Sequence, residues 1–261
     1  MNSNVVVLVC SCDKFEDTWE ICSKCLEEQW GDCPYERALL TESKPIPEHG
    51  FFDKVIHVNT KDWALMLHEA LDQIEQDYVI FLLEDQWPVE KINQKAIELA
   101  ISKMKSDLKI AIVYFEDSKI GGLKQAKAID DIYNEIPFGA PYRLSCAPGI
   151  FRKDYLYEMT NKEISPWDFE RVLSFDERGR NVRVLELKNS NWKRIDETGA
   201  IFRGKWVLGV GDYAKKLGIS LDLEKRQEQG NIDVLKRRIK DCLFNINPRI
   251  ILKIQNLIKN F

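Results

Sequence analysis

The sequence contains no run of eighteen apolar residues, the length that a membrane-spanning helix needs. Its first residues, 1–4, are polar and lead straight into an apolar stretch, so we expect no signal peptide. No G-x-G-x-x-G follows that stretch, and no G-x-x-x-x-G-K-[ST] occurs anywhere. These absences predict a cytoplasmic protein that is neither a dinucleotide-binding nor a P-loop enzyme.

Histidine is scarce: the three histidines form no motif, and no Ser-His-Asp order or nucleophile elbow is present, which argues against a hydrolase. Seven cysteines are an odd number, which we interpret as reduced thiols. The CxxC spacing of Cys22 and Cys25 makes a zinc site with Cys10 and Cys12 the alternative. Cys10, however, falls on an expected buried strand, and Cys22 and Cys25 share one helix face, where free cysteine packs as a small hydrophobe.

The most informative stretch is residues 77–88, in which six apolar residues run from Tyr78 to Leu83 and end in Glu84-Asp85. Such a short run, rich in β-branched and aromatic side chains, predicts a strand that is buried on both faces. Pro88 prevents the strand from continuing. The two carboxylates therefore lie at the carboxyl end of a central strand, where open α/β sheets bind ligands; a solvated acidic turn is the alternative.

Apolar runs of strand length alternate with stretches of helical periodicity along the first two thirds of the chain. This alternation predicts an α/β sheet with right-handed crossovers in one large domain. The expected strands are residues 4–10, 36–41, 54–59, 78–83, 110–115, 145–151 and 182–187. The expected helices are residues 17–29, 62–75, 89–104 and 154–159, with a further helix that begins at Ser165-Pro166.

Two segments differ from this pattern. Residues 116–145 are mostly polar and punctuated by glycine and proline, which predicts a long functional loop or flap. From Ile201 onward there are 13 Lys/Arg against 6 Asp/Glu, a net charge of +7, so the rest of the chain carries −11. We expect a basic helix over residues 231–245 and an amphipathic helix from Pro248, docked either on the chain itself or on an anionic membrane.

Three sequence patterns resemble the GT-A class of nucleotide-sugar glycosyltransferases, in particular a bacterial branch that acts in capsule or lipopolysaccharide assembly. The first runs from Trp63 to Asp85, with apolar residues at helical spacing and then the strand before Glu84-Asp85. The second is S-P-W-x-x-E at 165–170, preceded by F-R-K-D-Y-L at 151–156. The third is G-x-x-x-x-G-K-W at 199–206. The resemblance covers roughly residues 4–207. We expect residues 1–207 to form the catalytic domain, leaving residues 208–261 as a basic amphipathic helical tail.

The resemblance implies a donor site. Glu84-Asp85 occupies the place of the DxD motif, which in that class holds a divalent ion against the diphosphate. Because the sequence here is Glu-Asp-Gln, only Asp85 is carried over as the metal ligand, with Mg²⁺ or Mn²⁺ as the expected ion. The alternative is a metal-independent enzyme in which Lys193, Arg194 or Lys205 neutralises the phosphates.

By the same resemblance, the loop from Ser11 to Asp13 and the residue Glu42 lie where the class binds the base and ribose, since a carboxylate accepts hydrogen bonds from uracil or ribose. A solvated loop residue is the alternative for Asp13 and Glu42. Trp63 either stacks on a base or sugar, or belongs to the core. Lys205 is expected at the donor site.

Inverting glycosyl transfer needs one general base to deprotonate the acceptor hydroxyl. Glu170 and Asp168 are the candidates, and Glu170 is preferred because it matches the family pattern. The alternative is that both residues only cap their own helix, and Trp167 beside them is then an acceptor platform or core.

The sequence thus predicts a hexosyltransferase that moves a sugar from a UDP-type donor onto a glycan or lipid-linked acceptor, at the inner face of the cell membrane, without nucleic-acid partners. Two alternatives stay open. A nucleotidyltransferase uses a similar sheet but usually has a glycine-rich loop after the first strand, which residues 11–14 lack. A non-catalytic scaffold would bind through the basic helices alone.

Overall fold

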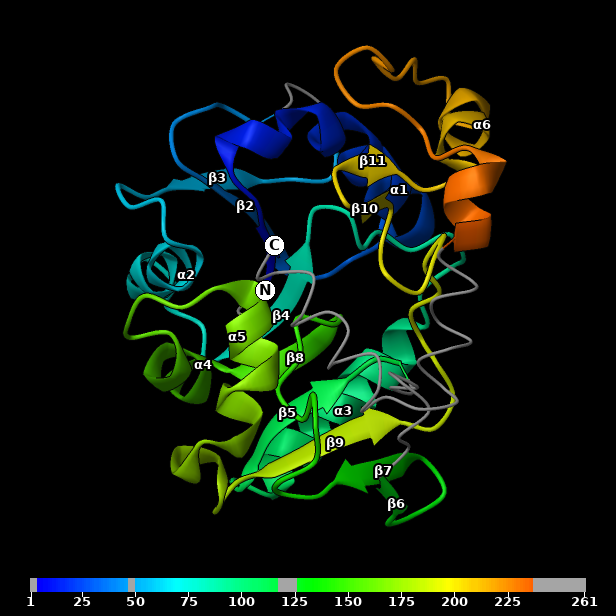
Figure 1. Cartoon of the computed structure of the whole chain (residues 1–261). Helices are drawn as coiled ribbons and strands as arrows, with labels where there is room; N and C mark the ends of the chain where they lie inside the picture. Colours follow the sequence, from blue (N-terminus) through cyan, green and yellow to red (C-terminus); the bar gives the residue numbers. More distant parts are fainter. Residues whose placement is uncertain (1–3, 47–49, 117–125, 237–261) are drawn as a thin grey trace, which may run out of the picture.

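The computed structural model of the chain describes residues 4–46, 50–116 and 126–236, in which strands and helices alternate as predicted (Figure 1). The strands are β1 (Val5–Cys10), β2 (Glu36–Thr41), β3 (Lys54–His57), β4 (Tyr78–Leu83), β5 (Ile110–Tyr114), β6 (Lys127–Ala128), β7 (Tyr133–Ile136), β8 (Gly149–Arg152), β9 (Arg183–Leu187), β10 (Ile201–Phe202) and β11 (Lys205–Trp206). The helices are α1 (Trp19–Trp30), α2 (Trp63–Asp72), α3 (Gln94–Ser106), α4 (Lys153–Met159), α5 (Pro166–Arg171) and α6 (Val210–Lys216), with short 3₁₀ helices η1 (Asp13–Thr18), η3 (Leu173–Phe175) and η4 (Glu177–Gly179).

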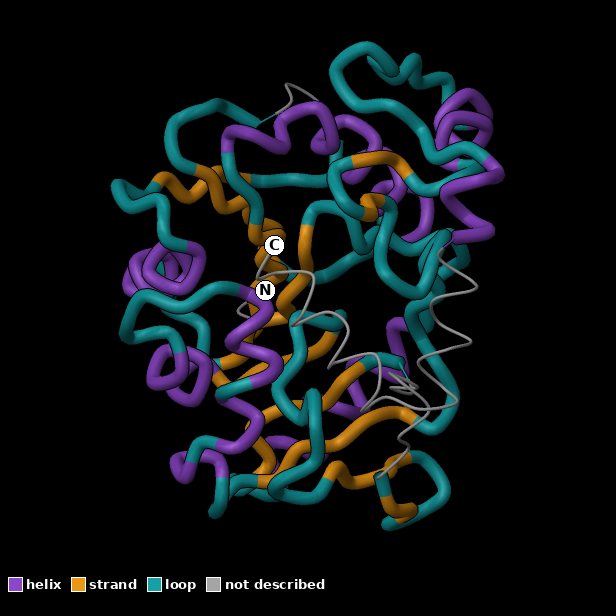
Figure 2. Tube along the Cα trace, viewed as in Figure 1, coloured by secondary structure: helices purple, strands orange, loops and turns teal. Residues whose placement is uncertain are grey.

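Nine strands form one sheet in the order β3-β2-β1-β4-β8-β5-β9-β7-β6, which runs through the middle of the molecule (Figure 2). β3, β2, β1 and β4 are parallel to one another, and β5 is parallel to β9. β8 lies antiparallel between β4 and β5, and β7 lies antiparallel between β9 and β6. The fold class expected from the sequence, a mixed α/β sheet flanked by helices, is therefore confirmed.

The two faces of the sheet belong to two separate core clusters because successive side chains of a strand point to opposite faces. Val5, Val7 and Val9 of β1 pack with α1 and α3 on one face. Val6 and Leu8 pack with α2, α4 and α5 on the other face. The apolar runs at β1 and β4 are thus buried on both faces, as their lack of alternation predicted.

Three differences from the sequence-based expectation have a clear physical reason or add new elements. α3 begins at Gln94 rather than at residue 89, because the Val89 amide bonds to the Lys193 carbonyl (2.8 Å) and Asn93 caps the helix. β8 begins at Gly149 rather than at residue 145, since the residues before it bond to side chains instead of a strand. The expected loop 116–145 also contains two short strands, of which β7 pairs with β9.

Gly149 lets β8 approach β5 closely: a Cβ there would lie 3.0 Å from the Tyr114 ring and from the Val113 carbonyl oxygen. Only glycine lets β8 fit so tightly beside β5.

The described part of the predicted tail packs against the rest of the chain. Val210 and Ala214 of α6 are fully buried in the same cluster as α1. Residues 231–236 are helical, as predicted, whereas the remainder of that basic helix and the stretch from Pro248 lie outside the described residues. Among the helices that are described, none has the length and apolar character needed to cross a membrane. A separate role for residues 208–261 stays a prediction.

Candidate functional site

The carboxyl ends of the parallel strands bring four polar segments to one edge of the sheet. The register places Cys10 of β1 between Leu40 of β2 and Leu83 of β4, so the residues that follow leave the sheet side by side. β1 leads to residues 11–13, β2 to Glu42, β4 to Glu84-Asp85 and β5 to Glu116. The sequence-predicted donor residues Ser11, Asp13, Glu42, Glu84 and Asp85 thus come from neighbouring strand ends, as parallel topology requires.

A hollow of about 660 Å³ opens at the ends of β1, β2 and β3. Its volume lies in the range of small-molecule sites, and its walls are mainly polar and charged. The lining residues are Cys12, Asp13, Lys14, Glu42, Ser43, Val58, Asn59 and Lys61.

Asp13 shapes this hollow by tying the loop after β2 to the loop after β1. Its carboxylate accepts hydrogen bonds from the Thr41 hydroxyl (2.6 Å), from the Ser43 amide (3.1 Å) and hydroxyl, and from the Lys44 amide (3.2 Å). Burial works against the charged form, but these bonds outweigh it and hold the pKa of Asp13 well below its usual value. The Asp13 amide in turn donates to Glu42. Asp13 is therefore a charged clamp of the wall, and Glu42 is the carboxylate beside it.

At the end of β4, Glu84 is buried and Asp85 is partly buried. Burial raises the pKa of both carboxyls, and the charge of Asp85 raises the pKa of Glu84 further. The Asp85 carboxylate accepts from the Ile201 amide (3.3 Å), and the Asp85 carbonyl accepts from the Ala200 amide (2.7 Å). In the described chain no other residue donates a hydrogen bond to the Glu84 carboxylate.

Gly199 allows the segment before β10 to approach Asp85. It has a φ of +94°, and a Cβ at this position would lie 2.6 Å from Asp85 Oδ2. Gly199 is the first glycine of the G-x-x-x-x-G-K-W pattern. Glycine is needed there because no other residue fits both the backbone conformation and the space.

Arg194 forms an ion pair at the end of β5. Its guanidinium donates to Glu116 (2.6 Å) in a pair whose side chains are 13% and 16% exposed. Its charge lowers the pKa of Asp85 and of Glu170. Its Nε is buried and has no hydrogen-bond partner among the described residues. A buried cation with an unused donor is suited to an anionic ligand.

Glu170 is held on α5 by its local sequence. Ser165 caps that helix by accepting from the Asp168 amide (3.2 Å), Pro166 follows at the first helical position, and Phe169 anchors the helix in the core. Glu170 points to the segment before β8 and accepts from the Ser145 hydroxyl (3.0 Å) and the Cys146 amide (2.9 Å).

The pKa of Glu170 is raised because burial outweighs those two hydrogen bonds and the charges of Arg171 and Arg194. A desolvated carboxylate with a raised pKa at a strand-end site has the properties of a general base.

The second base candidate, Asp168, lies on the exposed side of α5. It accepts from the Ser165 hydroxyl (2.8 Å) and lies 3.9 Å from Arg171. These contacts are those of a residue at a helix N-terminus. Trp167 is 66% exposed next to it, so it is not a core residue.

Three predicted donor residues have their side chains engaged by the protein. Trp63 packs edge-on against Phe81 and Phe169, with ring centroids 6.4 and 5.2 Å apart, in the core between α2 and α5. Ser11 is buried and accepts from the Trp19 indole (2.8 Å). Lys205 forms an ion pair with Asp233 (3.1 Å). Their roles in donor binding stay predictions.

The donor set at β4 fits a hard divalent ion. Two adjacent desolvated carboxylates are destabilised when both are charged, which a cation offsets, and Mg²⁺ is commonly held by one or two carboxylates plus substrate phosphates. Within residues 4–46, 50–116 and 126–236 there is no group of three or more His, Cys, Asp or Glu side chains that could hold a metal by themselves. Diphosphate oxygens would have to complete the coordination.

No family model matches the chain, and no curated protein matches its sequence. Among solved structures, it is similar to S. aureus TarS 1-349, with 14% identity over 71% of this chain and 58% of that chain, at a TM-score of 0.44. It spans 35% of a longer TarS chain. A cytidylyltransferase from Leptospira borgpetersenii is 13% identical over 95% of this chain and 97% of that chain, at a TM-score of 0.46.

A UDP-glucose pyrophosphorylase complexed with UDP-glucose is 10% identical over 71% of this chain and 90% of that chain, again at a TM-score of 0.46. The likeness concerns the fold alone.

Sequence reasoning missed Arg226 and Asp17, which lie close to this strand-end site. Arg226 is 9% exposed and reaches the neighbourhood of Glu84 and Asp85, whose pKa values its charge lowers. No motif marks either residue, and a contact across 209 positions has no local signal in one sequence.

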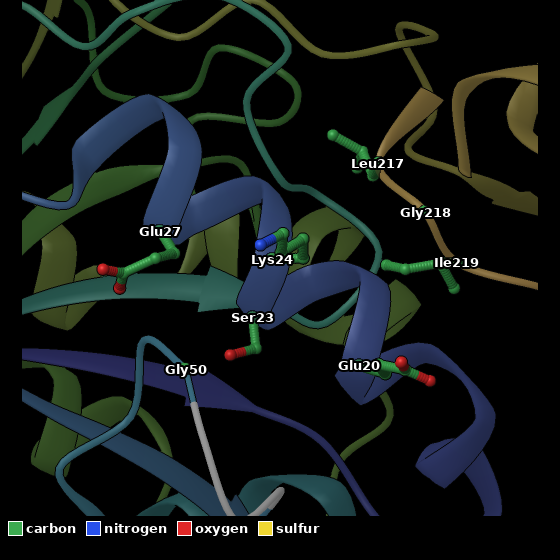
Figure 3. A pocket seen from close by; sticks show the side chains of 8 residues that line it. All are labelled: Glu20, Ser23, Lys24, Glu27, Gly50, Leu217, Gly218 and Ile219. Carbon is green, nitrogen blue, oxygen red and sulfur yellow. The ribbon is translucent and has the colours of Figure 1, made fainter. Parts of the chain in front are cut away.

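A second hollow, of about 500 Å³, lies on the outer side of α1, away from the strand ends. Figure 3 shows it between α1 and the segment Leu217–Ile219, with Ser23 pointing toward Gly50. The Ser23 hydroxyl accepts from the Phe51 amide (2.8 Å), which is a structural contact. None of the candidate residues lines this hollow.

Proposed function

We propose that this protein is a glycosyltransferase that moves a sugar from a nucleotide-diphosphate donor, a UDP-sugar, to a glycan or lipid-linked acceptor of a surface polysaccharide such as capsule or lipopolysaccharide. One observation carries the proposal. Glu170, a partly buried carboxyl with a raised pKa, is held at the same sheet edge as the Glu84-Asp85 pair, and the charge of Arg194 lowers the pKa of both Asp85 and Glu170. Glycosyl transfer needs these two functions, a base and a diphosphate site, next to each other.

The nucleoside is assigned to the hollow at the ends of β1 to β3. The Asp13 clamp fixes its wall, which leaves Glu42, Asn59 and main-chain groups to meet the base and ribose. Carboxylate and amide oxygens accept hydrogen bonds from uracil N3–H and from ribose hydroxyls.

The diphosphate is assigned to Glu84, Asp85 and Arg194. Mg²⁺ or Mn²⁺ held by the two carboxylates would offset the charge that develops on the leaving diphosphate. The buried Nε of Arg194, which has no partner among the described residues, supplies a hydrogen-bond donor for the diphosphate. The proposal favours Arg194 over the other two candidate cations because Lys193 is 63% exposed and pairs with Glu90, and Lys205 pairs with Asp233.

In the proposed step, the acceptor oxygen attacks the anomeric carbon of the donor sugar. The new C–O bond forms as the bond from that carbon to the diphosphate oxygen breaks, and the nucleoside diphosphate leaves with the electron pair. Glu170 takes the proton of the acceptor hydroxyl. Ser145 and Cys146 orient its carboxylate through the hydrogen bonds given above.

The first test is calorimetric titration with UDP, GDP and CDP, each with and without Mn²⁺. We expect binding of UDP that weakens at least tenfold in Glu84→Gln. Asp168→Asn is the matched control, because it removes an exposed carboxylate at the same edge. Binding of UDP that does not require Mn²⁺ would still support a glycosyltransferase and would assign the phosphate contacts to Arg194. If none of the three nucleotides binds, the proposal is wrong.

The reaction itself is tested by product. A glycosyltransferase releases UDP from a UDP-sugar, slowly to water and faster when an acceptor is present. A nucleotidyltransferase instead releases pyrophosphate from a nucleoside triphosphate and a sugar phosphate. Release of pyrophosphate without release of UDP would show that the protein is a nucleotidyltransferase and not a glycosyltransferase.

A further inference from the structure

The segment after α6 contributes one buried charge to the candidate donor site. Arg226 donates two hydrogen bonds to the carboxylate of Asp17 (2.7 and 3.0 Å), and both side chains of this pair are only 9% exposed. A planar guanidinium and a carboxylate joined in this way have a fixed relative orientation. The contact therefore holds η1, which contains Asp17, in one position.

Arg226 is enclosed by two different parts of the chain. On one side are Phe15 and Asp17 of η1, with the guanidinium 5.1 Å from the Phe15 ring centroid. On the other side is the β10–β11 hairpin, where the Gly204 carbonyl accepts from the guanidinium (3.2 Å) and the Trp206 ring centroid lies 5.4 Å away. Arg226 is thus a joint between η1 and the hairpin.

Each of these two parts carries one side of the donor site. η1 begins at Asp13, whose carboxylate clamps the wall of the nucleoside hollow. The hairpin begins at Ile201, whose amide holds the Asp85 carboxylate. No other described side chain forms polar contacts with both η1 and the hairpin.

A buried ion pair gives little net stability, since desolvation of the two charges opposes their attraction. Its defined geometry fits a positioning role better than a stabilising one. The segment between α6 and residue 231 makes a second contact with the hairpin: the Trp206 amide donates to the Gln227 carbonyl (2.9 Å), and the Gln229 amide donates to the Trp206 carbonyl (2.8 Å). These two hydrogen bonds hold the residues that directly follow Arg226 against the hairpin.

We propose that Arg226 is a positioning residue of the donor site, which acts through Asp17 and the hairpin to set the nucleoside wall and Asp85 relative to each other for a nucleoside diphosphate. This inference rests on the proposed function. It places residues 205–229, which the sequence assigned mostly to a separate tail, inside the functional unit.

The test compares Arg226→Gln with Arg178→Gln in the full-length protein. Arg178 forms the same kind of fork with Asp176 (2.9 Å for both bonds) but lies at η4, with no contact to the site. We expect both variants to lower the melting temperature. Only Arg226→Gln is expected to weaken UDP–Mn²⁺ binding, by about tenfold or more, since losing one partner of a buried pair leaves the other uncompensated.

Two further variants separate positioning from general damage. Arg226→Lys keeps the charge without the fork and is expected to recover part of the affinity, which also covers the case in which Arg226→Gln does not fold. Asp17→Asn is expected to weaken binding in the same direction. The double variant with Arg226→Gln is expected to bind no more weakly than the worse single variant, because the two residues act as one unit. Wild-type affinity in a folded Arg226→Gln protein, or fully additive losses in the double variant, would overturn the proposal.

Hydrogen exchange tests whether Arg226 links η1 to the hairpin even if the proposed function is wrong. If the wild-type protein binds none of the nucleotides, exchange in residues 13–18 and 199–206 is still expected to rise in Arg226→Gln and not in Arg178→Gln. Unchanged exchange in both segments would overturn the joint itself. If exchange rises in these segments but no nucleotide binds, Arg226 links η1 to the hairpin, but the site is not a nucleotide-donor site.

Discussion

Glu170 shows how one residue can be suited to chemistry at the expense of stability. Its folded-state pKa is raised by burial, so the folded protein holds the proton more tightly than the unfolded chain does. The stability that this residue contributes at low pH is therefore lost as the pH rises from the unfolded pKa, about 4.3, through the raised folded value.

We predict that Glu170→Gln lowers the transfer rate by roughly 10²- to 10⁴-fold, the usual contribution of a general base. Nucleotide affinity is expected to stay unchanged, since the amide keeps an oxygen for Ser145 and Cys146. The melting temperature at pH 8 is expected to equal or exceed that of the wild-type protein, because an uncharged group replaces a desolvated carboxylate. Kinetics, calorimetry and thermal melting check the three parts. A lower melting temperature with full activity would exclude the base role.

The same shift predicts the pH profile. Only the ionised form of Glu170 can take a proton, so we expect the transfer rate to fall as the pH is lowered through a midpoint clearly above the ordinary glutamate value of about 4.3. The profile of kcat is measured under saturating donor. Asp168→Asn is expected to leave the midpoint unchanged. A midpoint at the ordinary value would show that the titrating base is an exposed carboxylate.

At the scale of elements, α2 illustrates how a cap can link two parts of the structure. Asp62 accepts from the amides of Ala64 and Leu65 (3.1 Å each), and its carboxylate also lies 3.4 Å from the Ile164 amide, just before α5. We predict that Asp62→Ala lowers the free energy of unfolding by about 1 kcal/mol. Urea denaturation measures it, and Asp62→Asn, which keeps the cap, is the control expected to lose much less.

The segment before β10 gives a second prediction at this scale. Gly199→Ala places a Cβ against Asp85 Oδ2 at a positive φ, so the segment has to move away from the carboxylate. We expect a loss of about 1–3 kcal/mol in the free energy of unfolding and weaker nucleotide binding. Gly204→Ala is the matched control: it also has a positive φ (+76°) but has no atom within 4 Å of the added Cβ. Equal loss of binding in both variants would mean that the contact with Asp85 is unimportant.

At the scale of the whole molecule, the C-terminal region divides into a part that packs on the sheet domain and a part that we expect to act elsewhere. We predict that a chain ending at residue 236 keeps its fold and its nucleotide affinity. A chain ending at residue 207 loses α6 and Arg226 and is expected to be strongly destabilised, because buried Asp17 is left without its partner. Thermal melting and calorimetry distinguish the two. Normal binding by the shorter chain would contradict this division.

The basic stretch from Pro248 carries the proposed peripheral membrane contact. A chain that ends at residue 247 is expected to lose co-sedimentation with vesicles that contain anionic lipid, and salt is expected to weaken binding of the full chain. Vesicles of neutral lipid serve as the control. Retained binding by the shortened chain would remove the basis for a membrane role of this stretch.

The sequence by itself determined the sheet and the position of Glu84-Asp85 at the end of one of its strands. Uninterrupted apolar runs such as Val5–Cys10 and Tyr78–Leu83 are stable only as strands covered on both faces, and parallel strands bring their carboxyl ends to one edge. The position of Glu84-Asp85 after such a run therefore followed from local composition, and the S-P cap before α5 placed Glu170 on a helix.

The tertiary structure alone decided which of these residues meet. The antiparallel insertion of β8 brings Ser145 and Cys146 to Glu170, and the segment after β9 brings Arg194 to Glu116. Trp63 packs against the core because its ring lies edge-on to Phe81 and Phe169. Arg226 reaches Asp17 across 209 positions. Periodicity and capping act over a few residues, whereas these contacts depend on the free energy of packing the whole chain, which no single segment of the sequence encodes.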